Sequence, residues 1–329
     1  MKHKATTFFN LATALGAVLL ITPLFPAEPP QMHQGRGRCV HGPGSKNPGG
    51  ERTKRPKYEF VTFDIQGGYY DTLFGINNDG LAIGWYYDSA DNPTRSFSFL
   101  WRAGHEKAIE YRSSSIVYFG DVNDRGLAFG TVGSNSYTQA AVFDVYKNSW
   151  TLLPDVDGKN MNQAMRMNNH GVGVGQACQG DWWTNAENCI GWIWDGKAYS
   201  YVTLAGTDQP WTGPLAINDR NQIVGQYTDG VHMHSYLQDH SRITVLDVPG
   251  ATDTYAIAIN NAGEILLDPE FAGGVNQNYI LKDGVLIPLP VPSADAVNTY
   301  AYGLNDRGDF CGRWYDAQGE SHAFVAYRR

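Results

Sequence analysis

A short motif occurs six times in this chain of 329 residues and constrains its fold more than any other feature. Each copy has an apolar residue, Asn, then Asn or Asp, one variable residue, and Gly or Asn. The first asparagines of the six copies lie 42 to 50 residues apart and are Asn77, Asn123, Asn168, Asn218, Asn260 and Asn305. A period of about 20 to 50 residues is typical of repeat arrays, in which each unit buries its hydrophobic face against its neighbours. The sequence therefore predicts an array of six similar units.

Each motif predicts a tight turn between two short strands. Asn followed by Asn or Asp caps a turn with local hydrogen bonds, and the Gly or Asn at its end tolerates a left-handed backbone. Short apolar strands such as residues 256–259 come before the turn, and strands such as residues 222–227 follow it. A third strand carries a small residue and usually an aromatic one, as at residues 98–99, and residues 243–247 illustrate a fourth. Four strands per unit of about 45 residues are typical of a propeller blade.

We therefore predict an all-β, six-bladed β-propeller of four-stranded blades. The last repeat ends after its third strand, at residues 321–327, and a matching fourth strand occurs instead at residues 59–65. Asp64 precedes Asn77 by the same thirteen residues that separate Asp247 from Asn260. The N-terminal strand should therefore complete the last blade, which removes two exposed sheet edges.

The third-strand sequence adds a family resemblance. Ser-His-Ala-Phe at residues 321–324, together with the Ile-Asn-Asn-x-Gly turns, resembles the HAF-repeat family of bacterial extracellular proteins. The resemblance covers residues 59–329, although the motif becomes His-Ser-Tyr at 234–236 and Gln-Asn-Tyr at 277–279. It implies export and a repeat fold, and it implies no catalytic residues.

Two segments are predicted to precede the propeller. Residues 1–27 begin with a basic stretch, continue with apolar residues 8–21 and end at Ala27, which is the pattern of a signal peptide. An uncleaved anchor is the alternative. Residues 28–57 are rich in Pro, Gly and basic residues and are expected to be a disordered linker. Residues 58–329 form the propeller domain in this interpretation, and we expect the protein to be secreted, either extracellular or periplasmic.

The charge distribution bears on the partners. Residues 1–57 hold nine of the 25 Lys and Arg and two of the 33 Asp and Glu, so 16 bases and 31 acids remain and residues 58–329 carry a net charge of −15. Such a surface disfavours nucleic acid as a partner. We expect an extracellular glycan or a small polar ligand, a monomer, and no membrane span once the signal peptide is removed. Most of the negative charge is interpreted as an aid to solubility.

The four cysteines give one disulfide prediction. Cys178 and Cys189 flank the longest loop within a repeat, at the ends of two strands that should be neighbours. In an exported protein, these two residues are expected to form a disulfide. Cys311 lies in a predicted strand and Cys39 in the linker, and the sequence leaves open whether they pair or stay free.

Candidate ligand-binding residues lie in the loops between the second and third strands and in the connections between units. Both sets should emerge on one face, where function commonly lies. Sugar rings bind aromatic faces beside polar groups. The residues of this kind are Tyr69, Tyr70, Tyr86, Tyr87, Asp88, Asp181, Trp182, Trp183, Trp211, Tyr227 and Asp229. Their alternative role is packing between blades. The carboxylates could also hold a cation such as calcium, but no complete set of metal ligands is found in the sequence.

Two further sets of residues concern the centre of the ring. The repeated asparagines could line a ligand site, but turn capping explains them and is favoured. Two residues before each first Asn the chain has a small residue in four repeats and Asp121 or Arg166 in the other two. Because these two residues fall in consecutive repeats, we predict an ion pair that lines the central channel. It could also form the polar floor of a ligand pocket.

The function favoured by these features is an exported binding module for a glycan or similar polar ligand. The alternatives are a glycan-cleaving enzyme that uses loop carboxylates and a scaffold for protein partners. No motif for a serine nucleophile, a zinc protease or a phosphate-binding loop occurs in the sequence. The catalytic residues, if there are any, are unknown at this level.

Overall fold

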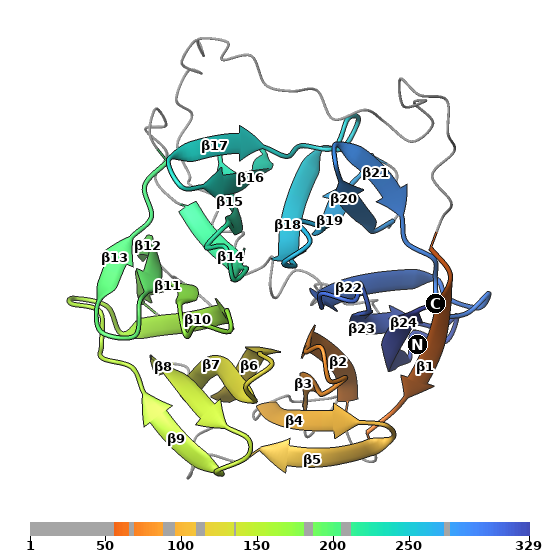
Figure 1. Ribbon diagram of the computed structural model, residues 1–329, viewed down its shortest axis with the longest axis horizontal. Helices are drawn as coiled ribbons and strands as arrows, with labels where there is room; N and C mark the ends of the chain where they lie inside the picture. The colour runs from red at the N-terminus through yellow and green to blue at the C-terminus, as the bar shows by residue number, and fades with distance from the viewer. Residues whose placement is uncertain are drawn as a thin grey trace, which may run out of the picture.

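A computed structural model describes residues 56–65, 69–87, 96–109, 116–134, 136–180, 187–204, 212–272 and 277–329. These ranges contain 24 strands and, within them, no helix. The strands surround a central axis, with the first strand of each repeat innermost, which is the arrangement of a β-propeller (Figure 1). The predicted signal peptide and nearly all of the predicted linker lie outside the described residues.

We number the repeated units along the chain. Unit 1 contains β2 (Tyr69–Ile76), β3 (Ala82–Tyr87), β4 (Ser96–Arg102) and β5 (His105–Ile109). Unit 2 contains β6 (Ile116–Val122), β7 (Leu127–Ser134), β8 (Tyr137–Asp144) and β9 (Ser149–Leu152). Unit 3 contains β10 (Met161–Met167), β11 (Gly173–Gln179), β12 (Glu187–Trp194) and β13 (Tyr199–Tyr201).

The remaining units follow the same order. Unit 4 contains β14 (Thr212–Ile217), β15 (Ile223–Thr228), β16 (Met233–Asp239) and β17 (Arg242–Val245). Unit 5 contains β18 (Asp253–Ile259), β19 (Ile265–Glu270), β20 (Tyr279–Lys282) and β21 (Val285–Pro288). Unit 6 contains β22 (Asn298–Leu304), β23 (Phe310–Tyr315) and β24 (Ser321–Arg328), and it takes its fourth strand, β1 (Tyr58–Phe63), from the other end of the domain.

Hydrogen bonding divides the strands into four sheets. Units 4, 5 and 6 are separate four-stranded sheets, whereas units 1 to 3 share one sheet of twelve strands. Within that sheet, only single parallel pairs connect the units, namely Ser96 with Ile116 and Met161 with Thr138. All other pairings are antiparallel and lie within a unit.

The repeated turns have the predicted chemistry. In unit 1 the Oδ1 atom of Asn77 accepts hydrogen bonds from the backbone N–H groups of Asp79 (3.0 Å) and Leu81 (2.9 Å). Gly80 closes the turn with a φ angle of 77°, and in unit 4 Asn221 takes the same left-handed conformation with a φ of 57°. The same pair of bonds recurs in units 2, 3, 4 and 6, and in unit 5 the Oδ1 atom of Asn260 accepts from the N–H of Glu264. The prediction that each first Asn caps its own hairpin is confirmed.

Every innermost strand also contains a β-bulge at the same place, which the sequence did not reveal. In unit 1, Leu73 and Gly75 pair with consecutive residues of β3, so that Phe74 has no partner. The bulged residues are Phe74, Gly120, Met165, Leu215, Ile257 and Tyr302. The rings of Phe74 and Tyr302 meet between units 1 and 6, with their centroids 4.9 Å apart. A bulge re-aims the residues beside it, and here it presents backbone carbonyls to the axis.

The N-terminal strand closes the ring as predicted. Residues 58–63 pair antiparallel with residues 323–328. Phe60 packs its ring against both Phe310 and Phe324 in unit 6. Beyond the strand, the N–H group of Ile65 donates to the Oδ2 atom of Asp71 at 2.5 Å, which joins the closing strand to unit 1.

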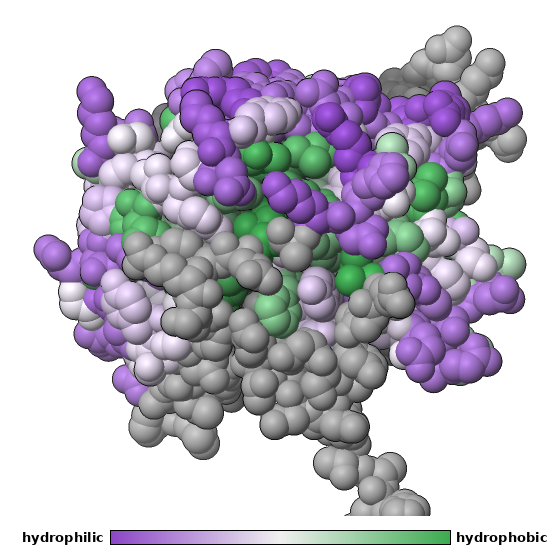
Figure 2. Space-filling model, turned by 90° about the horizontal axis from the view of Figure 1, so that it is seen from below, coloured by the Kyte–Doolittle hydropathy of each residue, from purple (hydrophilic) through white to green (hydrophobic). Residues whose placement is uncertain are grey.

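Seen edge-on, hydrophobic residues gather near the middle of the side shown in Figure 2, between hydrophilic borders. Among the residues that the structure describes, no helix has the length and apolar character needed to cross a membrane.

Cys178 and Cys189 form a disulfide, as predicted. Such a bond is consistent with an oxidising, extracytoplasmic environment. Cys311 is buried and free, and Cys39 lies outside the described residues.

We expect replacement of both Cys178 and Cys189 by Ser to lower the free energy of unfolding by about 2–3 kcal/mol, because the bridge closes a short loop and restricts the unfolded chain. Chemical denaturation of the variant and of the native protein would measure the difference. Cys311→Ser serves as the control for loss of a thiol. Two free thiols at residues 178 and 189 in the native protein would contradict the assignment.

Candidate functional site

The strand directions give the propeller two distinct faces. The turn face carries the six Asn turns between first and second strands. The loop face lies at the opposite ends of those strands, where first strands begin and second strands end. Loops between second and third strands, and the connections between units, therefore emerge at the loop face.

On the turn face, the first asparagines link each unit to the next. The Nδ2 atom of each first Asn donates to the backbone carbonyl of the first Asn in the following unit, at 3.0 to 3.2 Å. The last bond, from Asn305 to Asn77, joins unit 6 back to unit 1. The cycle is therefore closed, and each Asn stabilises both its own turn and the ring.

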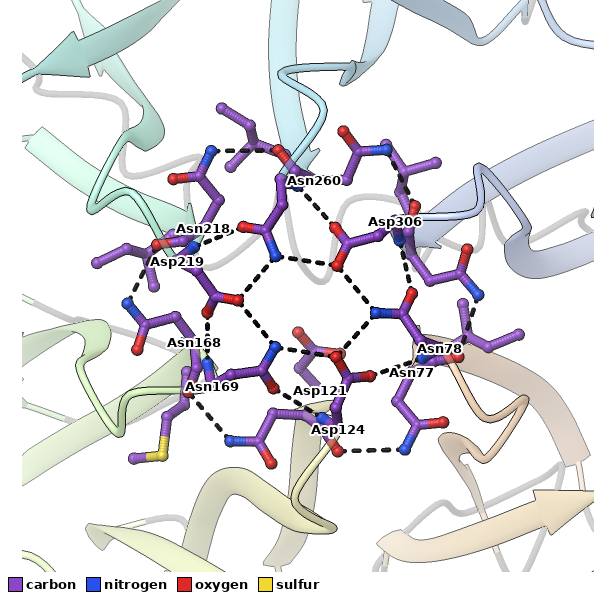
Figure 3. Close-up of a pocket in the computed structure, with 18 of the residues that line it drawn as sticks. Asn77, Asn78, Asp121, Asp124, Asn168, Asn169, Asn218, Asp219, Asn260 and Asp306 are labelled. Atoms are coloured by element: carbon purple, nitrogen blue, oxygen red, sulfur yellow. Dashed lines mark hydrogen bonds between the residues drawn. The ribbon is translucent and has the colours of Figure 1, made fainter.

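A second closed ring lies just inside the first (Figure 3). It consists of the next residue of each motif, and Asn and Asp alternate strictly around it. Its members are Asn78, Asp124, Asn169, Asp219, Asn261 and Asp306. The Nδ2 atom of each Asn donates to the Oδ2 atoms of both neighbouring Asp residues, at 2.8 to 3.0 Å. Each backbone N–H of the ring also donates to the side chain in the next unit, at 2.7 to 2.9 Å.

The alternation has a chemical reason. An amide group offers two donor hydrogens, and an ionised carboxylate only accepts. Donors and acceptors match at every contact only if the two residue types alternate, and alternation closes only around an even number of units. The alternation of Asn and Asp can be read from the sequence. We assigned these residues to separate turns, however, and did not predict the ring.

We expect Asn169→Asp to lower the free energy of unfolding by about 2–4 kcal/mol, because it removes two donated hydrogen bonds and places three carboxylates in a row. Asp219→Asn should cost less, about 1–2 kcal/mol, because the amide oxygen still accepts from both neighbouring amides and only the backbone N–H of Asn169 loses its acceptor. Urea unfolding of the two variants would measure the asymmetry. Equal costs would contradict the donor–acceptor account of the ring.

Below the ring lies a cavity of about 70 Å³, and the carboxylate of Asp121 lines it (Figure 3). The predicted ion pair is present: the Nη1 atom of Arg166 lies 3.2 Å from the Oδ2 atom of Asp121. The Nη2 atom of Arg166 donates to the carbonyls of Phe74 (3.0 Å) and Tyr302 (2.6 Å) at the bulges. Since β10 lies across the axis from β22 (Figure 1), this one side chain links units 2, 3, 1 and 6.

Arg166 is buried and Asp121 is partly buried, and neighbouring atoms pack closely around the pair. Burial raises the pKa of Asp121, while Arg166 opposes that rise. A Cβ atom at Gly75 would lie 2.2 Å from the Oδ1 atom of Asp121, so unit 1 needs glycine here. The position therefore acts mainly as a structural tie beneath the ring, and Asp121 contributes the carboxylate that lines the cavity.

The loop face has a different kind of repeat position. Eight residues after each first Asn, the second strand carries a side chain that differs from unit to unit. These side chains are Trp85, Thr131, Gln176, Gln226, Asp268 and Arg313. All are buried except Asp268, which is half-buried. We call them the variable layer, because the fold places them equivalently but does not dictate their chemistry.

Three residues of the variable layer have hydrogen-bond partners. The Oγ1 atom of Thr131 accepts from the N–H of Ala164, Gln176 donates to Gln163, and Asn278 donates to Asp268. In the other three residues, Trp85 Nε1, Gln226 Oε1, and Arg313 Nε and Nη2 are buried without a hydrogen-bond partner. Most buried polar groups in proteins are paired, so these unpaired atoms need an explanation.

Arg313 is the centre of a group of tyrosines, which we call the Tyr cluster. Its guanidinium carbon lies 5.4, 5.9 and 5.3 Å from the ring centroids of Tyr300, Tyr302 and Tyr315. Tyr70 and Tyr87 of unit 1 complete the cluster, and their rings meet edge to face with centroids 6.2 Å apart. Tyr70 is also a backbone outlier with a φ angle of 59°. An aromatic residue in this conformation stores strain, which is typical of functional sites.

Next to this cluster, unit 5 carries carboxyl groups with perturbed acidity. Burial, and after it the nearby Glu270 carboxylate, raise the pKa of Asp268 to about 7, and the hydrogen bond from Asn278 opposes the rise. Burial also raises the pKa of Glu270. Asp253 lies opposite Glu270 in the strand register, and Tyr255 lies opposite Asp268. Part of this group is therefore protonated near neutral pH.

Two histidines form matching clamps on the loop face. His234 lies 2.8 Å from Asp247 through Nδ1 and 3.2 Å from Asp229 through Nε2. His322 in unit 6 repeats this arrangement with Asp64 and Asp316. Each clamp joins a second strand, a third strand and the segment after a fourth strand. In units 2 and 5 the equivalent residues, Gln139 and Gln277, donate instead to the carbonyls of Leu153 and Leu289.

The clamp should make stability depend on pH. The hydrogen bond from His234 to Asp247 is the main reason that its pKa rises from 6.5 to about 9. A raised histidine pKa stabilises the folded state fully below pH 6.5, and this stabilisation is lost as the pH rises through about 9. We expect the stability difference between the native protein and His234→Gln to shrink across this window, as measured by melting temperature. His240→Gln, at a side chain that is 85% exposed, is the control and should show no such trend.

The structure brings some of the predicted ligand residues together and leaves others elsewhere. Tyr70 and Tyr87 join the Tyr cluster, but Tyr87 is only 4% exposed, so its ring packs in the core rather than facing a ligand as we expected. Tyr86 stacks on Phe97, with centroids 5.4 Å apart. Tyr227 stacks on His234, and Asp229 belongs to the same clamp.

The remaining predicted residues fall outside the described structure. They are Asp88, Asp181, Trp182, Trp183 and Trp211, together with the side chain of Tyr69. The sequence analysis missed the variable layer, although the fixed distance of eight residues from the repeated Asn marks it. In the described ranges, no group of three His, Cys, Asp or Glu side chains is placed to hold a metal ion.

Comparison with known proteins gives structural similarity only. No protein-family model matches the sequence, and no curated protein sequence is significantly similar to it. A gluconolactonase from Xanthomonas campestris is 12% identical, with 83% of this chain and 90% of that chain covered and a TM-score of 0.50. This likeness concerns the fold alone.

Two further solved structures are similar at lower scores. The β-propeller domain of the Trilobed protease from Pyrococcus furiosus is 12% identical over 80% of this chain and 83% of that chain, with a TM-score of 0.47. The Aleuria aurantia lectin AAL, in complex with Fucα1-6GlcNAc, is 10% identical over 80% and 93%, with a TM-score of 0.44.

Proposed function

We propose that the chain is an exported binding module that holds a glycan or similar polar ligand on its loop face. The observation that carries this proposal is the variable layer with its unpaired buried atoms on Trp85, Gln226 and Arg313. Polar atoms buried without partners cost about 1–3 kcal/mol each. A polar ligand at this face would supply the missing partners.

The repeat separates structural need from function. Residues that the fold requires recur in every unit, as the capping asparagines do. The variable layer instead holds an aromatic residue, a hydroxyl, two amides, an acid and a base at equivalent positions. The partly exposed rings of Tyr70 and Tyr315 lie beside it and would offer flat apolar faces to sugar C–H groups.

The finer fold description is part of this proposal. We propose that the six units are six blades and that the chain is a HAF-repeat propeller. The two closed cycles of six hydrogen-bond steps on the turn face support the count. Residues 1–27 would act as the signal peptide and residues 28–57 as a disordered linker, and the Cys178–Cys189 disulfide suits an exported protein.

A glycan array probed with the purified full chain tests the proposal. We expect one class of polar glycan to bind, and Tyr70→Ala and Tyr315→Ala each to weaken that binding by about tenfold or more, since stacking contacts carry much of the affinity for a sugar ring. Tyr146→Ala is the matched control, because Tyr146 is exposed and lies against Gly126 on the turn face. Absence of binding to every glycan, or equal loss with the control, would overturn it.

A second candidate is a glycan-cleaving enzyme. It is favoured by Asp268, because an acid with a pKa of about 7 is suited to donate a proton at neutral pH. Incubation of the bound glycan with the chain, followed by product analysis, separates the two functions. Cleavage of the glycan by the native chain but not by Asp268→Asn would establish catalysis. If the native chain leaves the glycan intact, the binding function is favoured.

A further inference from the structure

We propose that Arg313 is the anchor for a carboxylate, so that the ligand is an acidic sugar, a sugar ring that carries a carboxylate group. This inference rests on the proposed function, because it assumes that a glycan binds the loop face. It goes beyond it by naming the charged group that the site recognises and the residue that recognises it.

Among the residues that the structure describes, Arg313 differs from the other two arginines that are fully or partly buried. Arg166 is paired with Asp121, and Arg328 is paired with Glu264 at 2.9 Å. Arg313 is only 1% exposed, and no carboxylate of the described residues forms an ion pair with it. A guanidinium does not lose its proton in proteins, and an unmatched buried charge is costly. Arg313 therefore lacks the carboxylate partner that Arg166 and Arg328 each have.

The unpaired atoms of Arg313 define the geometry of that anion. Its Nη1 atom has a contact of 3.5 Å with the hydroxyl of Thr72 in unit 1. Its Nε and Nη2 atoms have no partner. These two nitrogens form one edge of the planar guanidinium, and their parallel N–H groups match the two oxygens of a carboxylate. A neutral hydroxyl group would satisfy only one of them.

Comparison between units shows that the fold does not need a cation here. At the equivalent position units 3 and 4 carry Gln176 and Gln226, which are also buried. Both are neutral, and Asp268 in unit 5 has the opposite charge. The arginine is therefore a property of unit 6 alone and not of the repeat.

The surroundings suit a sugar ring attached to the carboxylate. The rings of Tyr300, Tyr302 and Tyr315 stabilise the guanidinium, whose carbon lies 5.3 to 5.9 Å from their centroids. Tyr70 and Tyr315 are only partly buried, so they form the boundary between Arg313 and the loop face. The strained backbone of Tyr70 places an aromatic ring at this boundary.

The net charge of the domain leads to a second, independent expectation, which concerns how ligand affinity depends on salt. Residues 58–329 carry a net charge of −15, from 16 bases and 31 acids. This field repels an anionic ligand over long distances, and salt screens it. Binding through one buried arginine should therefore hold steady or tighten as salt rises from low to physiological concentration. Binding through a basic surface patch would weaken instead.

The test uses the full chain and paired glycans. The ligands are oligosaccharides that contain glucuronate, galacturonate, mannuronate or guluronate. Each is compared with its carboxyl-reduced, neutral counterpart. A sulfated oligosaccharide of equal length without carboxylates is the third ligand. Isothermal titration calorimetry measures the affinity. We expect at least one uronate to bind about tenfold or more tightly than its reduced counterpart. Arg313→Gln, which introduces the residue of units 3 and 4, should remove that preference, and Arg220→Gln, at an exposed position on the turn face, should keep it.

Each outcome decides something. Equal binding of a uronate and its reduced form, or a preference that survives Arg313→Gln, overturns the carboxylate assignment and leaves the proposed function standing. Binding of the sulfated oligosaccharide alone also overturns it. No binding of any glycan removes the proposed function with it. If Arg313→Gln does not fold, the paired glycans on the native chain still test whether a carboxylate is recognised, and Arg313→Lys, which keeps the charge but lacks the two-nitrogen edge, tests the assignment to Arg313.

Discussion

Replacing Arg166 with methionine should lower the free energy of unfolding by about 3–5 kcal/mol. Methionine keeps most of the side-chain volume but removes the charge. The variant would leave the Asp121 carboxylate buried without its partner and the carbonyls of Phe74 and Tyr302 without a donor. Because the guanidinium contacts units 1, 2 and 6 from unit 3, the loss should affect the whole ring. Urea denaturation would measure it.

Two comparisons separate the ion pair from the other bonds of Arg166. A double-mutant cycle with Asp121→Asn isolates the coupling between the two side chains. We expect Asp121→Asn to cost less than Arg166→Met, because the two carbonyl contacts remain. Arg220→Met on the exposed turn face is the control and should change stability by less than about 0.5 kcal/mol. A cost for Arg166→Met that matches this control would refute the structural role.

Removing the closing strand should have a similarly large effect. Deletion of residues 1–66 takes away β1, the outer pairing partner of β24, leaves β23 on its other side, and exposes Phe310 and Phe324 to solvent. We expect the melting temperature to fall by more than about 10 °C, together with a tendency to associate through the exposed strand edge.

Deletion of residues 1–55 is the matched control. It keeps β1 and the bond from the N–H of Arg329 to the carbonyl of Lys57, so its melting temperature should equal that of the native protein. Equal melting temperatures for the two deletions would show that β1 does not hold the ring closed.

The sequence predicted the parts of the fold that depend on local chemistry and on position within the repeat. Asn77 caps its turn with bonds to residues two and four positions away. Such contacts follow from spacing alone. The pairing of β1 with β24 followed from the equal offset of Asp64 and Asp247 from the next repeated Asn. The Asp121–Arg166 pair followed from one repeat position in consecutive units.

The candidate site was predicted less well. Loop position indicated the correct face, and Tyr70 does belong to the Tyr cluster. The same reasoning selected Tyr87, which packs in the core. It passed over Arg313, because a second-strand residue is expected to be structural. Loop membership says where a residue emerges, but it does not say whether its side chain turns outward or packs inward.

By itself, the sequence determined where the repeated turns lie, how each one is capped, which strand closes the array and which two opposite charges meet near the axis. These properties depend on neighbours along the chain or on equivalence between repeats, and both are visible in spacing. Only the tertiary structure decided which side chains meet between units. The bond from Asn305 to Asn77 spans 228 residues, and the His322–Asp64 contact spans 258. Whether Arg313 contacts a carboxylate or only tyrosines depends on side chains from several strands, and the spacing of the repeats does not show that these side chains meet. Burial then makes that difference matter, because an unpaired charge is costly only where water cannot reach it.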